Sequence, residues 1–282
     1  MKLGLSTYTY TWAFGVGNST PAKRMTARDL IQTASKNNIP VVQLADNYPL
    51  HALSMGEQKD LKYMADDHGV EIEVGSRGLT RDRISEYLDI AARFESPFLR
   101  FVIDEKNYEP DLQQIVEIIK EKLDDFHDRN IFLAIENHDR FTCKELIHII
   151  HQTDPHQIGL CLDTVNSLGA GEGIQEVMTQ LIPYALNFHI KDFTIQRLPH
   201  QMGFEVTGKP AGQGFLDLIP IINQLKNFQR CISCTLELWT PPEADLEATI
   251  AKEKAWADQS IQYLQSTGRF TLSTDSNNPK QS

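Results

Sequence analysis

Residues 186–193 read LNFHIKDF, and this short run already restricts the fold. Its apolar residues are those of a buried β-strand, yet His189, Lys191 and Asp192 lie among them. A strand that is apolar on both faces is typical of a parallel sheet covered by helices. Alternation along the strand points His189 and Lys191 to one face and Asp192 to the other. The stretch therefore predicts a covered parallel sheet that carries polar groups on its inner face.

Seven further β-rich runs accompany this one, and helical patterns lie between them. The predicted strands are 2–10, 40–47, 70–77, 97–104, 131–138, 158–165, 185–193 and 231–239. Apolar residues recur at spacings of three and four over 26–38, 56–69, 80–94 and 110–130. Thr26, Thr80 and Pro110 mark helix starts, while Gly69 and the pair Asn37-Asn38 mark helix ends. Eight strands alternating with helices predict an α/β fold, a single-domain (β/α)8 TIM barrel.

The barrel is expected to span residues 1–266. The segment 267–282 is polar and lacks periodicity, so we expect a loosely ordered C-terminal tail. An open doubly wound sheet is the alternative architecture, but no G-x-G-x-x-G motif follows the first strand.

Composition disfavours several classes of partner. The 282-residue chain has a net charge of -11, and nucleic-acid binding depends on Lys and Arg. No apolar run is long enough to cross a bilayer, and the first residues lack the apolar segment of a secretory signal. The four cysteines show no framework spacing, and we interpret the C-x-x-C of Cys231 and Cys234 as core packing. We therefore expect a cytoplasmic protein without a nucleic-acid or membrane partner; assembly into a homo-oligomer is compatible with the sequence.

Four predicted strands end in a side chain that binds metal ions: Glu136, Asp163, His189 and Glu237. In a (β/α)8 barrel the active site lies at the carboxyl ends of the strands, so these side chains can converge. Three carboxylates at one point would repel each other, and a divalent cation would remove that repulsion. Three oxygen ligands and one imidazole suit one Mn²⁺, Mg²⁺, Co²⁺ or Zn²⁺ ion, and the mixed set favours Mn²⁺ over Mg²⁺.

The segments AIENH, CLDTVNSLGAG, FHIKDF, GKPAGQGFLDL and TLELW resemble those of the xylose isomerase-like TIM barrels, which include sugar phosphate isomerases and epimerases and the AP-endonuclease family 2. The resemblance covers nearly the whole chain. It implies that Glu136, Asp163, His189 and Glu237 are the metal ligands, and that Glu136 and Glu237 are also the acid/base pair. The implied enzyme is a metal-dependent sugar isomerase or ketose epimerase that transfers a proton through a metal-bound cis-enediolate.

Other reactions stay open beside this one. The same enediolate serves a dehydratase, a lyase acting on a cyclic polyol ketone or similar hydroxy-ketone. An AP-endonuclease-like phosphodiesterase would need further histidines at the earlier strand ends, which the sequence does not supply. A non-catalytic sugar-binding barrel is the alternative outside enzymes. The sequence departs from the family's D-x-x-H motif, because Asn166 follows Asp163 where many relatives have histidine.

Lys191 shares the inner face with His189, and it is either an internal ion-pair partner of the carboxylates or a catalytic electrophile or proton donor. The segment 194–214 is long for a βα loop, which suggests a lid, and its GKPAGQG stretch could cradle a phosphate together with Lys209. Tyr8 and Tyr10 are expected on one strand face, and His51 is a further candidate for a hydroxyl contact. The predicted contacts of a small sugar or hydroxy-ketone substrate are Tyr8, Trp12, Asn47, His138, Asn166, Arg197 and Trp239.

Overall fold

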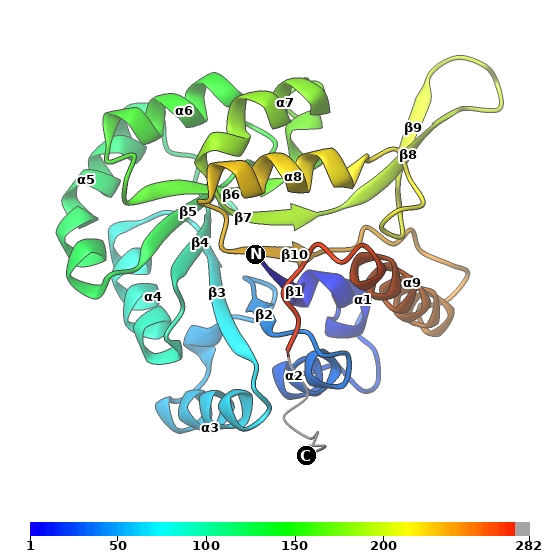
Figure 1. Cartoon of the computed structure of the whole chain (residues 1–282), viewed down its shortest axis with the longest axis horizontal. Coiled ribbons are helices and arrows are strands. Elements are labelled where there is room, and N and C mark those ends of the chain that lie inside the picture. The colour runs from blue at the N-terminus through cyan, green and yellow to red at the C-terminus, as the bar shows by residue number, and fades with distance from the viewer. Residues whose placement is uncertain (274–282) are drawn as a thin grey trace, which may run out of the picture.

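The structure, a computed structural model, describes residues 1–273 and contains a closed barrel of eight parallel strands (Figure 1). Each strand pairs in parallel with its neighbours, in the order β1-β10-β7-β6-β5-β4-β3-β2. The predicted (β/α)8 barrel is confirmed. The barrel strands are β1 (Lys2–Ser6), β2 (Val41–Leu44), β3 (Glu71–Arg77), β4 (Phe98–Val102), β5 (Phe132–Glu136), β6 (Ile158–Asp163), β7 (Ala185–Ile190) and β10 (Ser233–Leu236).

Helices surround the barrel and bury the outward faces of its strands (Figure 1). The α-helices are α1 (Thr11–Phe14), α2 (Ala27–Lys36), α3 (Met55–Asp67), α4 (Arg81–Phe94), α5 (Leu112–Arg129), α6 (Cys143–Gln152), α7 (Ile174–Leu181), α8 (Leu218–Phe228) and α9 (Leu246–Ser266). Short 3₁₀ turns are η1 (Thr7–Tyr10), η2 (Leu50–Ala52), η3 (Asn166–Leu168) and η4 (Ile182–Tyr184). In the part of the chain that the structure describes, none of the helices combines the length and apolarity needed to span a bilayer.

Local signals in the sequence explain where the helices begin and end. Thr26 and Thr80 are the N-caps of α2 and α4, and each side chain accepts a backbone N–H of the first turn. Helix α5 begins two residues after Pro110, because Asp111 provides the cap. Asn38 and Gly69 have positive φ angles just beyond α2 and α3, which ends these helices.

Several strands are shorter than predicted, and for two of them the early end changes where the following residues lie. Strand β1 ends at Ser6, because the Ser6 hydroxyl accepts the Tyr8 N–H while the Thr9 hydroxyl accepts the Ser6 N–H. This cap starts η1, so Tyr8 and Tyr10 do not share a strand face. Strand β7 ends at Ile190, and the chain from Asp192 forms a separate hairpin.

The hairpin replaces the expected irregular loop after the seventh barrel strand. It consists of β8 (Asp192–Arg197) and β9 (Phe204–Lys209), which pair antiparallel and project from the barrel (Figure 1). Its base is fixed beside the end of β10, since a Cβ at Gly208 would lie only 1.9 Å from the backbone oxygen of Trp239. The hairpin therefore stands at the rim where the carboxyl ends of the strands open.

The predicted tail, 267–282, is described only as far as residue 273. Thr271 forms a parallel bridge with Lys2, and Phe270 and Leu272 pack against the main core. The remainder of the predicted tail, 274–282, lies outside the described residues.

Helix α9 carries a buried carboxylate that closes the N-terminus of α1. Glu253 accepts the backbone N–H groups of Trp12 (2.9 Å) and Ala13 (3.1 Å) and is fully buried. Burial raises the pKa of Glu253 to about 7, despite the opposing effect of these two hydrogen bonds. Because the folded-state pKa is raised, Glu253 lowers stability as pH rises from its ordinary pKa of 4.5 through 7.

We expect Glu253→Gln to remove this pH dependence. As pH rises from 4.5 to 8, the wild type should lose about 3 kcal/mol of unfolding free energy relative to the variant. Urea titrations over this range measure the difference. Glu247→Gln, at an exposed position of the same helix, is the matched control and should show a flat difference. A flat difference for Glu253→Gln as well would contradict the assignment.

Candidate active site

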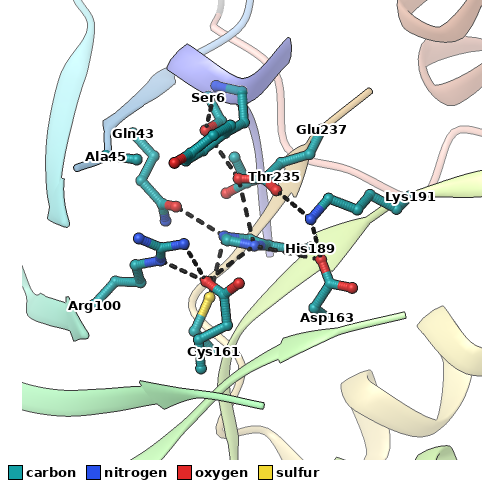
Figure 2. A network of polar contacts seen from close by, with 12 residues as sticks. Ser6, Gln43, Ala45, Arg100, Cys161, Asp163, His189, Lys191, Thr235 and Glu237 are labelled. Atoms are coloured by element: carbon teal, nitrogen blue, oxygen red, sulfur yellow. Dashed lines mark hydrogen bonds and ion pairs between the residues drawn. The ribbon is translucent and has the colours of Figure 1, made fainter. Parts of the chain in front are cut away.

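The four predicted metal ligands meet at the carboxyl ends of adjacent barrel strands. Figure 2 shows three of them, Asp163, His189 and Glu237, together with Lys191 and Arg100. Glu136 ends β5, Asp163 ends β6, His189 lies in β7, and Glu237 directly follows β10. All four are buried, with at most 2% of each residue exposed. The Nδ1 atom of His189 lies 3.7 Å from Glu136 Oε2, 3.8 Å from Asp163 Oδ2 and 3.5 Å from Glu237 Oε1.

The His189 imidazole fits a metal ligand. Its Nε2 contacts the side-chain oxygen of Gln43 at 2.8 Å, which is a hydrogen bond if Nε2 carries the proton. Its Nδ1 is buried and has no hydrogen-bond partner. In this tautomer the free lone pair of Nδ1 faces three carboxylates. Ligands about 2.1 Å from one ion in tetrahedral arrangement would be about 3.4 Å apart, close to the observed separations. The residues present thus fit a divalent cation, since Asp163, His189 and Glu237 bring ligand atoms within 4.8 Å of one another and Glu136 adds a carboxylate oxygen 3.7 Å from the same His189 nitrogen.

Two buried cations also lie among these carboxylates. Lys191 Nζ is 2.8 Å from Asp163 Oδ2 and 2.9 Å from Glu237 Oε2. Burial lowers the pKa of Lys191, but Asp163 and Glu237 outweigh it and hold that pKa well above its ordinary value. Burial raises the pKa of Glu237, but Lys191 and Arg100, joined by His189 when its imidazole is protonated, overcome this effect and hold that pKa well below its usual range.

Arg100 is the second cation, and sequence reasoning missed it. Its Nε and Nη2 both contact Oε2 of Glu136, and its Nη1 lies 2.6 Å from Asp46. Gly75 on the neighbouring strand makes room for it, since a Cβ there would lie 3.1 Å from the Arg100 Cδ. A charged residue inside the apolar run FLRFV was the available signal, because burial of an unpaired guanidinium is costly.

Asp46 links this cluster to the cavity wall. It accepts the Tyr8 hydroxyl at 3.0 Å, and Arg77 Nε lies 3.5 Å away. Burial raises the pKa of Asp46, but Arg100 and Arg77 more than offset this, so the net shift is downward. Asp46, Arg77 and Arg100 thus form a cluster of charged side chains on the side of the barrel made by β2, β3 and β4.

A cavity of 480 Å³ lies beside the cluster and is large enough for a sugar-sized molecule. Four of the residues predicted from sequence line it, together with Val206 of the hairpin: Tyr8, Asn166, Lys191 and Trp239. Asn166 also donates to Glu136 Oε1 at 2.9 Å, so the amide that replaces the family's histidine positions a predicted ligand. Trp239 is 43% exposed and provides an apolar wall at the cavity mouth.

The structure places the other predicted contacts outside this cavity lining. Trp12 donates its indole N–H to the Thr240 carbonyl, and Asn47 is hydrogen-bonded to Thr7. His138 faces Asp139 at 3.4 Å. Arg197 lies on the hairpin, where its guanidinium stacks 4.4 Å from the Phe204 ring centroid. Each of these side chains is thus engaged by a neighbouring group of the chain.

The GKPAGQG stretch, which could have formed a phosphate cradle, binds a carboxylate of the chain itself. The backbone N–H groups of Gly212 and Gly214 donate to Asp192 Oδ2, each at 2.9 Å, and Leu216 N–H donates to Oδ1 at 3.1 Å. The Asp192 carboxylate therefore occupies the position in which a phosphate would bind. His51 is also committed elsewhere, since its Nδ1 lies 2.7 Å from the Tyr87 hydroxyl.

With fold and site established, comparison with known proteins assigns the family. Residues 31–267 match the model of the xylose isomerase-like TIM barrel, and the chain belongs to this family. The 3-oxo-isoapionate decarboxylase of Pectobacterium atrosepticum is 30% identical over 94% of this chain and 95% of its own length.

Solved structures share the fold at lower sequence identity. D-psicose 3-epimerase of Clostridium cellulolyticum, determined with D-tagatose, superposes with a TM-score of 0.72 at 15% identity, covering 95% of this chain and 98% of that one. A xylose isomerase-like barrel of Mycobacterium smegmatis in complex with magnesium gives a TM-score of 0.66 at 14% identity, covering 93% and 97%. Relatives with named activities are thus enzymes, and a family member holds a divalent cation.

A divalent cation bound at these residues would stabilise the folded protein. We expect Mn²⁺ at 100 times its dissociation constant to raise the unfolding free energy of chelator-treated protein by about 2.7 kcal/mol, because only the folded chain brings the four ligands together. Chemical denaturation with and without Mn²⁺ measures this gain. His189→Gln, which removes the Nδ1 ligand, should abolish it. Equal stabilisation of both proteins would place the ion elsewhere.

Proposed function

We propose that this chain is a divalent-metal-dependent decarboxylase of a 3-oxo sugar acid. The observation that carries the proposal is that both glutamates expected to act as bases are bonded to buried cations, Glu136 to Arg100 and Glu237 to Lys191. A carboxylate in a buried ion pair is a weak base. Decarboxylation of a 3-oxo acid requires no base; it requires an electron sink and a proton donor. The full-length similarity to a 3-oxo-isoapionate decarboxylase supports the same class.

The reaction balances without a further co-reactant. The bond between C1 and C2 breaks, C1 leaves as carbon dioxide, and its electron pair forms the enolate of the 3-oxo group. A proton then adds to C2 and gives a hydroxy-ketone. A divalent cation held by Glu136, Asp163, His189 and Glu237 would supply the Lewis acid that stabilises the enolate oxygen.

The chain's own residues supply the remaining requirements. Lys191 lines the cavity and has 16% of its side chain exposed, so its ammonium is the group placed to return the proton to C2. Asn166 and Tyr8 line the same cavity with polar atoms that can bind hydroxyls. With a divalent cation bound, Arg77, Arg100 and Lys191 would offset the site's carboxylates, so an anionic substrate meets no repulsive field.

Sugar epimerisation or isomerisation is the second candidate. Oxygens of Glu136 and Glu237 approach the same His189 nitrogen, at 3.7 and 3.5 Å. Two carboxylates beside one bound substrate are what proton removal and return require. This reading needs at least one glutamate to leave its ion pair before it can act as a base.

Parallel incubations of the protein in deuterium oxide with Mn²⁺ distinguish the decarboxylase from the epimerase or isomerase. 3-Oxo-isoapionate should release carbon dioxide and yield a product with one solvent deuteron at the former C2, while D-psicose and D-tagatose should remain unexchanged. Deuterium exchange or epimerisation of the ketoses, without carbon dioxide release from the oxo acid, would replace the decarboxylase by the epimerase. Glu136→Gln, which removes one ligand charge, serves as the low-activity control for both reactions.

A further inference from the structure

A polar network lies in the barrel interior below His189, on the side away from the cation site. Gln43 of β2, Glu73 of β3 and Asn187 of β7 form it, and each is buried, with at most 2% exposed. Their strands supply inward-facing positions by alternation. Nothing in the proposed reaction uses these residues directly. Their hydrogen-bond directions nevertheless determine what His189 presents to a metal ion.

The amide of Gln43 has a defined orientation. Its Nε2 donates to Glu73 Oε2 at 3.1 Å and to Asn187 Oδ1 at 3.2 Å. Its Oε1 therefore faces His189, 2.8 Å from Nε2. An amide oxygen only accepts, so the His189 Nε2 must carry the proton to complete this hydrogen bond. The lone pair of the imidazole is then on Nδ1, toward Glu136, Asp163 and Glu237.

The partners around the amide exclude the reversed arrangement. Asn187 donates through Nδ2 to the hydroxyls of Ser233 (2.8 Å) and Thr235 (3.0 Å), which leaves Asn187 Oδ1 as the acceptor. The Ser233 hydroxyl donates to the second oxygen of Glu73. An ionised carboxylate is an acceptor only. If the Gln43 amide were flipped, its oxygen would face the Glu73 carboxylate oxygen. Neither of these two oxygens carries a proton, so no hydrogen bond could form between them.

Cys161 is consistent with this arrangement. Its thiol lies 3.1 Å from Asn187 Oδ1, to which it donates, and 3.1 Å from His189 Nε2. Because the thiol proton goes to Asn187, it does not compete for Nε2. The donors of Gln43, Asn187, Ser233 and Cys161 then all have acceptors with a single orientation of each amide.

We propose that Glu73 is a positioning residue that acts through Gln43 to hold His189 in its Nε2–H tautomer, with Nδ1 free for a metal ion. The proposal rests on the metal centre of the proposed function, although its tautomer component applies to the metal-free protein as well. Partners that fix the tautomer of a ligating histidine are important for metal affinity. Glu73 fixes the tautomer of His189 indirectly, because it orients the Gln43 amide that contacts the imidazole.

Two measurements at pH 8.5 test the proposal, since burial raises the pKa of Glu73 to about 7 and the carboxylate is ionised there. Long-range ¹H–¹⁵N correlation spectra of the metal-free wild type should show the Nε2–H tautomer of His189. Titration with Mn²⁺ should show about tenfold weaker binding in Glu73→Gln, because the new amide allows Gln43 both orientations. The spectra of this variant should show a mixture of tautomers.

Ser233→Ala is the matched control. It changes the same buried cluster and the same carboxylate, but it keeps the bond from Gln43 to Glu73, so its Mn²⁺ affinity should stay within about twofold of wild type. A wild-type Nδ1–H tautomer would overturn the proposal even if Glu73→Gln failed to fold. Unchanged affinity in Glu73→Gln, or an equal loss in Ser233→Ala, would overturn it as well. If the wild type bound no Mn²⁺, the proposed function would fail while the tautomer spectra still decided this inference.

Discussion

Arg100→Met is expected to destabilise the protein by about 3–5 kcal/mol, the range for removing one partner of a buried ion pair. Arg100 is 2% exposed and contacts both Glu136 and Asp46. Methionine fills much of the space but leaves buried Glu136 without the guanidinium and Asp46 with Arg77 alone. The free energy of unfolding, from urea titration of the metal-free protein at neutral pH, measures the loss.

Arg81→Met is the matched control, since Arg81 also pairs with a glutamate, Glu121, but at the surface. Water replaces the lost partner there, so the unfolding free energy should remain nearly unchanged. The double variant Arg100→Met/Glu136→Gln should recover part of the loss by removing one unpaired charge. Losses of similar size for Arg100→Met and Arg81→Met would mean that Arg100 is not needed to compensate the buried carboxylates.

The sequence predicted the barrel because each local signal agreed with the global one. Apolar strands at regular intervals, helix caps such as Thr26 and glycines such as Gly69 are all local features that need no knowledge of distant contacts. The same holds for the four predicted ligands, since alternation and the barrel's polarity bring Glu136, Asp163, His189 and Glu237 to one rim. Alternation also turned Asp192 away from them, which agrees with its bonds to the Gly212 and Gly214 backbone.

Residues inside strands escaped notice because only strand ends were considered. Gln43 in VVQL, Glu73 in VEIEV and Arg100 in FLRFV are polar residues within buried runs, as His189 is in LNFHI. The cost of burying a polar group without a partner was sufficient reason to single them out. Applied to all eight strands, that criterion would have identified both the cation beside Glu136 and the network below His189.

Substrate contacts were harder to predict, because they depend on how the connecting segments fold. The Ser6 cap turns the chain into η1, which brings Tyr8 to the cavity and buries Tyr10 in the core. The hairpin places Arg197 at its far end, where it pairs with Phe204, and leaves Val206 against the cavity. Such turns arise from individual backbone hydrogen bonds that periodicity does not encode.

Lys191→Met is expected to lower kcat of the Mn²⁺-loaded enzyme by about 10²–10⁴-fold, the contribution of a positioned general acid. Under the proposed reaction, Lys191 returns the proton to carbon, and methionine has none to give. Mn²⁺ affinity should not fall, because Asp163 and Glu237 lose an ammonium that competes for their oxygens. Decarboxylation rates at saturating substrate and Mn²⁺ titrations of the same preparation separate these effects.

Lys191→Arg distinguishes proton transfer from charge balance. Arginine preserves the positive charge beside Asp163 and Glu237 but does not release its proton, so folding stability should be retained while turnover stays low. Turnover of Lys191→Arg near the wild-type rate would show that the positive charge alone matters. Retained turnover in Lys191→Met would contradict any role of Lys191 in the chemical step and leave it as a counter-ion. A low rate in both variants, with Mn²⁺ affinity intact, is the pattern that assigns Lys191 as the proton donor.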